Sequence, residues 1–160
     1  MPSLSYDSLE EALSDIRAVR AAGPEKEHNY NYDYVNIYEM DHIYVLEEVP
    51  PQFGCKQVPS VILGPNGIRL SYCIEVEYVE DVAFMWCSGM DKEERIEAIS
   101  QNFFELERYQ DTEFYFGYGW DDIFIYWWKD DDEYTLKYTK DIEISPEELI
   151  DYLDVVRYDF

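Results

Sequence analysis

The amino-acid sequence predicts a single α+β domain, with an antiparallel sheet of about five to seven strands and helices packed mainly on one of its faces. Two observations support this fold class. Segments with apolar residues at alternate positions are followed by segments with apolar residues at helical spacing. In addition, 47% of the 160 residues are hydrophobic and 18% are aromatic, which is enough to form the core of one domain.

Residues 1–23 are predicted to contain an N-terminal helix. Asp7 or Ser8 can cap its first turn, and Glu10 or Glu11 follows three residues later, as in a capping box. A Gly-Pro pair at 23–24 ends the helix. The apolar residues at helical spacing are Leu9, Ala12, Leu13, Ile16 and Val19.

Residues 33–107 are predicted to form the first half of the sheet and its helix. A polar, tyrosine-rich connection precedes the segment 35–49, whose composition predicts a hairpin with its turn near Met40 and Asp41. A proline-rich loop follows this hairpin.

The same half contains a strand, a second strand and a capped helix. After a turn at 64–67, apolar residues alternate over 68–78, which predicts a long half-buried strand, and residues 82–87 are expected to pair with it. Asp91, with Glu94 three residues later, begins a helix. Its predicted apolar stripe is Ile96, Ile99, Phe103 and Leu106.

Residues 114–160 are predicted to form the second half. The segments 123–128 and 133–139 form a hairpin, and Ser145 caps a helix that has proline at its first position. The apolar residues that follow are Leu149, Ile150, Leu153 and Val156. Both halves therefore contain strand, strand and capped helix, which fits a tandem ββα duplication of low sequence identity. The alternative is that a hairpin followed by a helix is simply a common arrangement.

The charge balance restricts the binding partners. The chain has 36 Asp and Glu against 12 Lys and Arg, a net charge of −24, and the acidic residues are spread along the whole sequence. Direct binding to nucleic acid or anionic lipid is disfavoured, because the sequence lacks a basic patch that would release counterions. A basic partner protein is expected instead.

The cellular location is inferred from the absence of targeting and membrane-spanning segments in the sequence. It has no secretory signal and no apolar run near the ~20 residues of a membrane helix. Its three cysteines are odd in number and show no C-x-x-C spacing, so no disulfide framework or metal motif is expected and a reduced compartment is favoured. The protein is therefore expected to be cytoplasmic, without a membrane partner.

The segment 120–138 holds the candidate binding residues. Phe124, Tyr126 and Trp128 share one face of a predicted strand that is apolar on both faces, so this strand is either central and covered or bears a recognition surface. The predicted partner-binding residues are Asp121, Asp122, Asp130, Asp131, Asp132 and Glu133, with Tyr126 and Trp128 as anchors. Residues 47–53, two acids beside a proline-rich loop, are a secondary candidate.

The acidic run 130–133 has three interpretations. It is a solvated turn, an acidic protein-binding knob, or a calcium loop. The calcium loop lacks the glycine and the terminal glutamate at EF-hand spacing, with Asp141 at the position of that glutamate.

No motif in the sequence supports catalysis. There is no Walker A loop and no G-x-G-x-x-G, and neither His28 nor His42 belongs to a metal-binding pair. Nothing near Cys55 favours a Cys–His nucleophile with His42 over a structural cysteine. The sequence therefore predicts no enzyme, no catalytic residue, no metal site and no cofactor.

The leading hypothesis is a non-catalytic inhibitor whose acidic surface mimics nucleic acid and occupies the basic site of a partner. Anti-CRISPR and anti-restriction proteins of phages or mobile elements fit this description, as do immunity proteins against nuclease toxins. The alternatives are adaptation to high salt with an unrelated function, a virion component or homodimer that assembles with itself, and a small hydrolase or ligand-binding domain.

Overall fold

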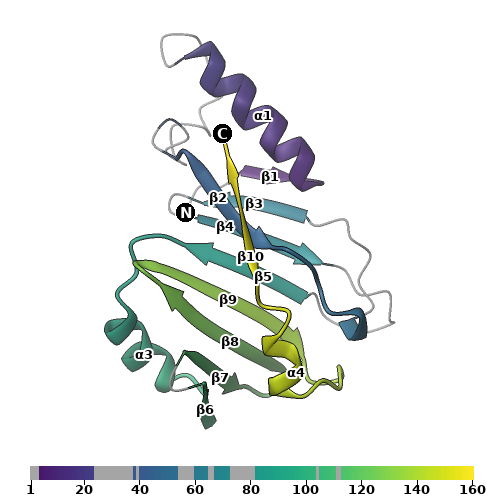
Figure 1. The fold of residues 1–160 in the computed structure, drawn as a ribbon, viewed down its shortest axis with the longest axis vertical. Coiled ribbons are helices and arrows are strands. Elements are labelled where there is room, and N and C mark those ends of the chain that lie inside the picture. The colour runs from purple at the N-terminus through teal and green to yellow at the C-terminus, as the bar shows by residue number, and fades with distance from the viewer. Residues whose placement is uncertain are drawn as a thin grey trace.

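An eight-stranded antiparallel sheet forms the main layer of the protein, seen in a computed structural model (Figure 1). The structure describes residues 4–23, 38, 40–53, 60–64, 67–72, 82–103, 105–110 and 113–160. In spatial order the strands are β1 (Leu4–Tyr6), β3 (Ser60–Gly64), β4 (Gly67–Tyr72), β5 (Val82–Cys87), β9 (Asp132–Thr139), β8 (Asp122–Lys129), β7 (Phe114–Tyr118) and β6 (Glu105–Tyr109).

A two-stranded ribbon crosses in front of this sheet (Figure 1). It consists of β2 (His42–Leu46) and β10 (Val155–Asp159), which pair antiparallel from Val155 opposite Leu46 to Asp159 opposite His42. The helices in the described residues are α1 (Leu9–Ala22), α3 (Lys92–Ser100) and α4 (Pro146–Ile150), together with the short 3₁₀ helix η1 (Pro51–Phe53).

The predicted helix starts are confirmed at all three helices. The Ser8 side chain accepts a hydrogen bond from the Glu11 amide at 3.1 Å, and Gly23, with φ of 81°, ends α1. Asp91 accepts from the amides of the first turn of α3, and Ser145 does the same for α4 at 3.2 Å. Each cap acts through residues three or fewer positions away, so the sequence contains the information directly.

The predicted ends of α3 and α4 are wrong. The apolar stripes were extended to Leu106 and Val156, but these two residues lie in β6 and β10. Leu106 still packs in the same cluster as Ile99, and Phe103 joins them. For Leu106, the helical spacing therefore reflected membership of one apolar cluster, although the helix ends before this residue.

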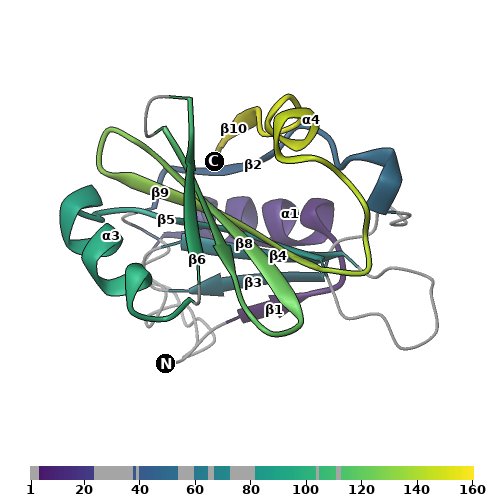
Figure 2. The same cartoon turned by 90° about the horizontal axis from the view of Figure 1, so that it is seen from below.

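The sheet has a different cover on each face. On the ribbon face, named here for the β2–β10 ribbon, the main core combines Phe84, Trp127 and Tyr134 with residues of α1, α4, β2 and β10. Figure 2 shows the ribbon and α4 on one side of the strands and α3 apart from them. On the other face, the α3 face, Ile99 packs against Tyr115 and Tyr126. The prediction that the helices pack mainly on one face is therefore correct for α1 and α4 and wrong for α3.

Several predicted strands differ from the observed ones. Among the described residues the main sheet has eight strands where five to seven were expected, and four of them, β1, β3, β6 and β7, were not recognised in the sequence. The second strand of the predicted hairpin 35–49 is β2, which pairs with β10. The first strand of that hairpin, except for Tyr38, and residues 73–78 of the predicted long strand lie outside the described residues.

The tandem ββα duplication is not confirmed. The two proposed units are β4–β5–α3 and β8–β9–α4, and both contain a pair of adjacent antiparallel strands. Their helices, however, pack on opposite faces of the sheet, since α3 joins the α3-face cluster and α4 joins the main core.

Candidate functional site

The predicted partner-binding residues lie at opposite ends of one strand. Asp121 and Asp122 are at the start of β8, whereas Asp130 and Asp131 form the turn to β9. A strand of eight residues at ~3.4 Å per residue separates them by roughly 24 Å. The acidic residues of this hairpin therefore contribute to two separate surfaces.

Glu133 is an internal residue rather than a surface acid. Its side chain is 4% exposed, and its Oε1 accepts from Arg95 Nε at 2.7 Å and from Trp128 Nε1 at 3.1 Å. Arg95 belongs to α3, and its hydrogen bond to Glu133 raises its pKa. Glu133, one of the predicted partner-binding residues, is therefore buried, and its carboxylate connects α3 to the sheet.

The two predicted aromatic anchors are covered by α3. Tyr126 is 8% exposed, and burial raises its pKa to about 12. Trp128 is half-buried, with Lys92 Nζ 5.8 Å from its ring centroid. The aromatic face of β8 is therefore not an open sheet surface, and Phe124 and Trp128 are only partly exposed.

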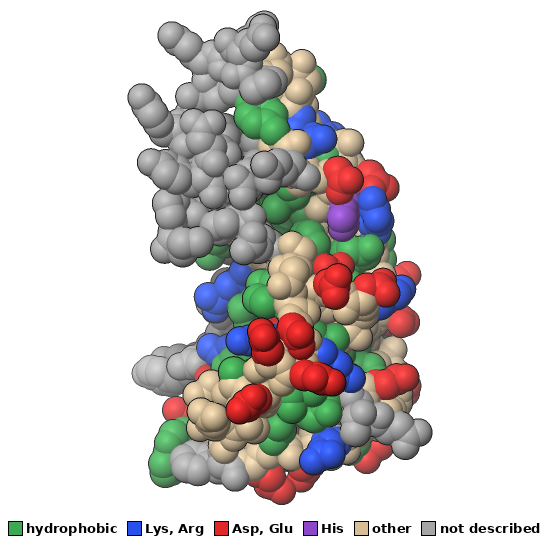
Figure 3. Space-filling model, turned by 90° about the vertical axis from the view of Figure 1, so that its left-hand side faces the viewer, with side chains coloured by type: hydrophobic (Ala, Val, Ile, Leu, Met, Phe, Trp, Pro, Cys, Tyr) green, Lys and Arg blue, Asp and Glu red, His purple; other side chains and the backbone are tan. Residues whose placement is uncertain are grey.

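A first hollow lies between the β8–β9 turn and the start of α3. This hairpin-tip hollow measures about 720 Å³ and is lined by Gly89, Met90, Asp91, Lys92, Glu93, Asp130 and Asp131. The Met90 amide donates to the Asp131 carbonyl at 2.7 Å and joins the two connections. Figure 3 shows this side of the molecule, where acidic side chains gather in the lower half with basic and apolar ones between them.

Sequence reasoning missed the contribution of α3 to this hollow. Asp91 was recognised only as a helix cap, and Glu93 was not singled out. Their carboxylates come next to Asp130 and Asp131 through pairing of β5 with β9, a contact distant in sequence. Asp132, beside the turn, is partly buried, and desolvation raises its pKa.

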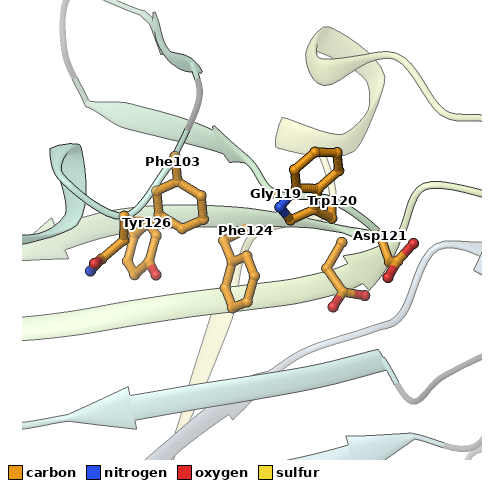
Figure 4. A pocket seen from close by; sticks show the side chains of 8 residues that line it. Phe103, Gly119, Trp120, Asp121, Phe124 and Tyr126 are labelled. Atoms are coloured by element: carbon orange, nitrogen blue, oxygen red, sulfur yellow. The ribbon is translucent and has the colours of Figure 1, made fainter.

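A second hollow lies at the other end of β8. This Trp120 groove measures about 420 Å³ and is lined by Asn102, Phe103, Gly119, Trp120, Asp121, Asp122, Phe124 and Tyr126. Figure 4 shows the rings of Tyr126, Phe103 and Phe124 in a row along β8, with Trp120 and Asp121 beyond them. The groove thus combines an aromatic wall with two carboxylates.

The secondary candidate, residues 47–53, is partly a structural segment. Phe53 is buried and stacks on Tyr138 with ring centroids 5.2 Å apart, and Gln52 Nε2 donates to Glu148 Oε1 at 2.6 Å. Glu47 and Glu48 remain exposed. The segment therefore ties α4 to the sheet and leaves two acids on the surface.

Within the described residues, the contacts of His42 and Cys87 do not form a catalytic pair. His42 bonds to the neighbouring Asp41 and packs against the rings of Tyr44 and Trp86. Burial raises the pKa of the Cys87 thiol, which disfavours a nucleophilic thiolate. Across the same part of the chain, no three His, Cys, Asp or Glu side chains are grouped to hold a metal ion. His28, Cys55 and Cys73 lie outside it.

No protein family, curated protein or solved structure matches the chain. Among the helices that the structure describes, none is long and apolar enough to cross a membrane. The fold and its surface define an acidic α+β protein with an acidic hollow at the start of α3 and an aromatic and acidic groove lined by residues that follow α3 and by β8.

Proposed function

We propose that the protein is a non-catalytic inhibitor that occupies the basic nucleic-acid-binding site of a partner protein. The observation that carries the proposal is the hairpin-tip hollow, where Asp91, Glu93, Asp130 and Asp131 from two elements border one concave surface. The settings that fit are an anti-CRISPR or anti-restriction protein, or an immunity protein against a nuclease toxin.

The way these carboxylates are held supports mimicry of a polyanion. Asp91 is fixed by its hydrogen bonds to the Glu93 and Glu94 amides, and the turn at Asp130 and Asp131 is tied to Met90. A rigid acidic surface loses little conformational entropy when it binds. A net charge of −24 also attracts a basic partner over long range and makes association fast at low salt.

Displacement of nucleic acid from defined partners tests this proposal. Fluorescence anisotropy would follow labelled DNA or RNA bound to a purified CRISPR effector, a restriction enzyme and a nuclease toxin while the protein is added. We expect it to displace nucleic acid from at least one of them, with an affinity that falls steeply as salt rises.

Two variants with the same change in charge separate the hollow from the general acidity. The hollow variant carries Asp91→Asn, Glu93→Gln, Asp130→Asn and Asp131→Asn; asparagine can still cap α3 and adopt the positive φ of 56° at position 130. The control variant carries Asp141→Asn, Glu143→Gln, Glu147→Gln and Asp154→Asn, all exposed and outside the hollow. We expect the hollow variant to lose at least tenfold more affinity than the control. No displacement from any partner, or displacement that is insensitive to salt, would refute the proposal.

A further inference from the structure

We infer that the Trp120 groove binds an arginine side chain of the partner protein. The inference rests on the proposed function for its choice of a basic protein as the partner. It adds the chemical group that is recognised, a guanidinium, and the surface that recognises it.

The wall of the groove is a rigid set of aromatic rings. The Phe103 ring centroid lies 5.3 Å from that of Phe124 and 6.1 Å from that of Tyr126, and the rings of Phe124 and Tyr126 are nearly parallel at 10°. Gly117 makes room for this arrangement, because a Cβ there would lie 2.6 Å from the Phe103 ring. The guanidinium group is planar and weakly hydrated, and it stacks on such surfaces.

Trp120 is the exposed member of the groove. Its side chain is 83% exposed, and no other large hydrophobic side chain among the described residues is exposed. The backbone around it is fixed, since the Gly119 amide donates to the Asp122 carbonyl at 3.0 Å and the Lys140 amide to the Asp121 carbonyl at 2.9 Å. Tryptophan gives the strongest cation–π contacts, and an exposed tryptophan on a fixed turn is typical of a binding hot spot.

The charges of the groove favour a cation. Both Asp121 and Asp122 line it, and no lysine or arginine does. Lys137 Nζ lies 3.6 Å from Asp122 Oδ2, so it offsets one carboxylate in part. Arginine carries five N–H donors in a fork that matches carboxylate oxygens.

Other ligands fit this site less well. Phosphate or carboxylate groups would be repelled by the two aspartates. A lysine ammonium is compact and strongly hydrated, and it gains less than arginine from a broad aromatic wall. The volume of about 420 Å³ lies within the range of roughly 300–1,000 Å³ that ligand pockets show, which is room for one long side chain and adjacent backbone.

A pair of peptides of equal shape tests the inference. Acetyl-Gly-Arg-Gly-amide and its citrulline counterpart, which replaces the guanidinium with a neutral urea group, would be titrated into the isotope-labelled protein and followed by NMR. We expect saturable shifts of the Trp120 indole N–H and of the Gly119 and Asp121 amides with the arginine peptide. The citrulline peptide should bind about tenfold more weakly or not at all. Equal binding of the two peptides, or no saturable shift at these groups, would overturn the inference.

Two variants show whether the named side chains make the contact. Trp120→Ala and Asp121→Asn are expected to weaken binding of the arginine peptide about fivefold or more each, and Asp141→Asn, an exposed control, to leave it unchanged. Trp120 and Asp121 are exposed, so the fold should persist, which circular dichroism would check. Retention of binding by both groove variants would count against the site.

The same variants separate this inference from the proposed function. If Trp120→Ala displaces nucleic acid as well as the natural protein does while the hollow variant fails, the arginine site is wrong and the proposed function stands. If the arginine peptide binds but no nucleic acid is displaced from any partner, the inhibitor function is wrong and the groove remains an arginine-binding site.

Discussion

At the scale of single residues, Glu133 differs from every other acidic residue that the structure describes, because it alone is buried. Sequence reasoning grouped it with the turn residues Asp130 and Asp131, since the four acids are consecutive. The position of Glu133 in β9 sets the direction of its side chain. Glu133 pairs with Trp128 across the β8–β9 ladder and points to the face where α3 supplies Arg95. One carboxylate of this run is therefore part of the scaffold.

Replacing Glu133 with glutamine should destabilise the protein. The variant leaves Arg95 without a charged partner, but the Arg95 side chain is 35% exposed and water can reach it. We therefore expect the free energy of unfolding to fall by about 2 kcal/mol, less than the ~3–5 kcal/mol of fully buried pairs. Urea denaturation measures this value. Glu97→Gln, an exposed change on the same helix, should stay within about 0.5 kcal/mol, and equal effects of the two changes would contradict the role of Glu133.

Buried tyrosines make the protein sensitive to alkali. Burial raises the pKa of Tyr126 and of Tyr138 to about 12, above the ordinary ~10. The folded state favours the neutral phenol. The contribution of the two phenols to the free energy of unfolding is therefore complete below pH ~10 and is lost as the pH rises toward 12. The free energy of unfolding as a function of pH, followed with tyrosinate absorbance, should fall across this range. Across this pH range, the free energy of unfolding of the Tyr126→Phe variant should fall by less than that of the natural protein. Titration of all tyrosines near pH 10 without loss of stability would contradict the assignment.

At the scale of elements, the β4–β5 pair depends on a glycine. A Cβ at Gly67 would lie 1.8 Å from the carbonyl oxygen of Trp86, so any side chain forces the two strands apart. A Cβ at Gly64 would meet its nearest atom at 4.0 Å, which is ordinary contact. These two glycines, which pair with each other across β3 and β4, therefore make a matched pair for substitution.

We expect Gly67→Ala to lower the free energy of unfolding by about 3 kcal/mol or more, and Gly64→Ala by less than about 1 kcal/mol. Chemical denaturation of both variants measures the difference. Similar stabilities would mean that β4 can shift relative to β5 without cost.

The elements predicted correctly are those with local signals. Caps such as Ser8 and Ser145 act within one turn, and the hairpin around Asp130 and Asp131 joins neighbouring segments, so the sequence specifies them directly. The pairing of β2 with β10 joins residues from distant parts of the chain and has no local signal. The short strands β1 and β6 are stabilised by neighbours in the sheet more than by their own pattern.

The candidate site was predictable only in part for the same reason. Asp121, Asp122, Asp130 and Asp131 line surface hollows at the two ends of β8. The cover that α3 places over Tyr126, and its contribution of Asp91 to the acidic hollow, depend on long-range packing. Phe103 was expected in a helix, yet its role in the groove comes from the chain after α3.

At the scale of the whole molecule, the apolar core opposes the repulsion of a large negative charge. The main core extends from Ile16 of α1 through Phe84 to Leu149 of α4, and aromatic rings such as Trp127 and Tyr134 stack within it. Such a core favours a chain that remains folded without high salt, in contrast to the salt-adaptation alternative.

Circular dichroism at low and high ionic strength tests this expectation. We expect the protein to be folded at ~10 mM salt, where the screening length is ~30 Å, and its melting temperature to rise by roughly 4 °C at 1 M as repulsion is screened. Unfolding at ~10 mM with recovery only near 1 M would support adaptation to high salt instead.

The ribbon has a consequence for synthesis of the protein on the ribosome. Residues 42–46 are synthesised more than 100 residues before their partner strand, residues 155–159, and the Phe160 amide donates to the Asp41 carbonyl at 3.0 Å. At ~5–20 residues per second, Ile43 and Val45 wait several seconds with no strand beside them. Until residues 155–159 are made, the edge of β2 presents unpaired backbone groups, to which chaperones and proteases can bind.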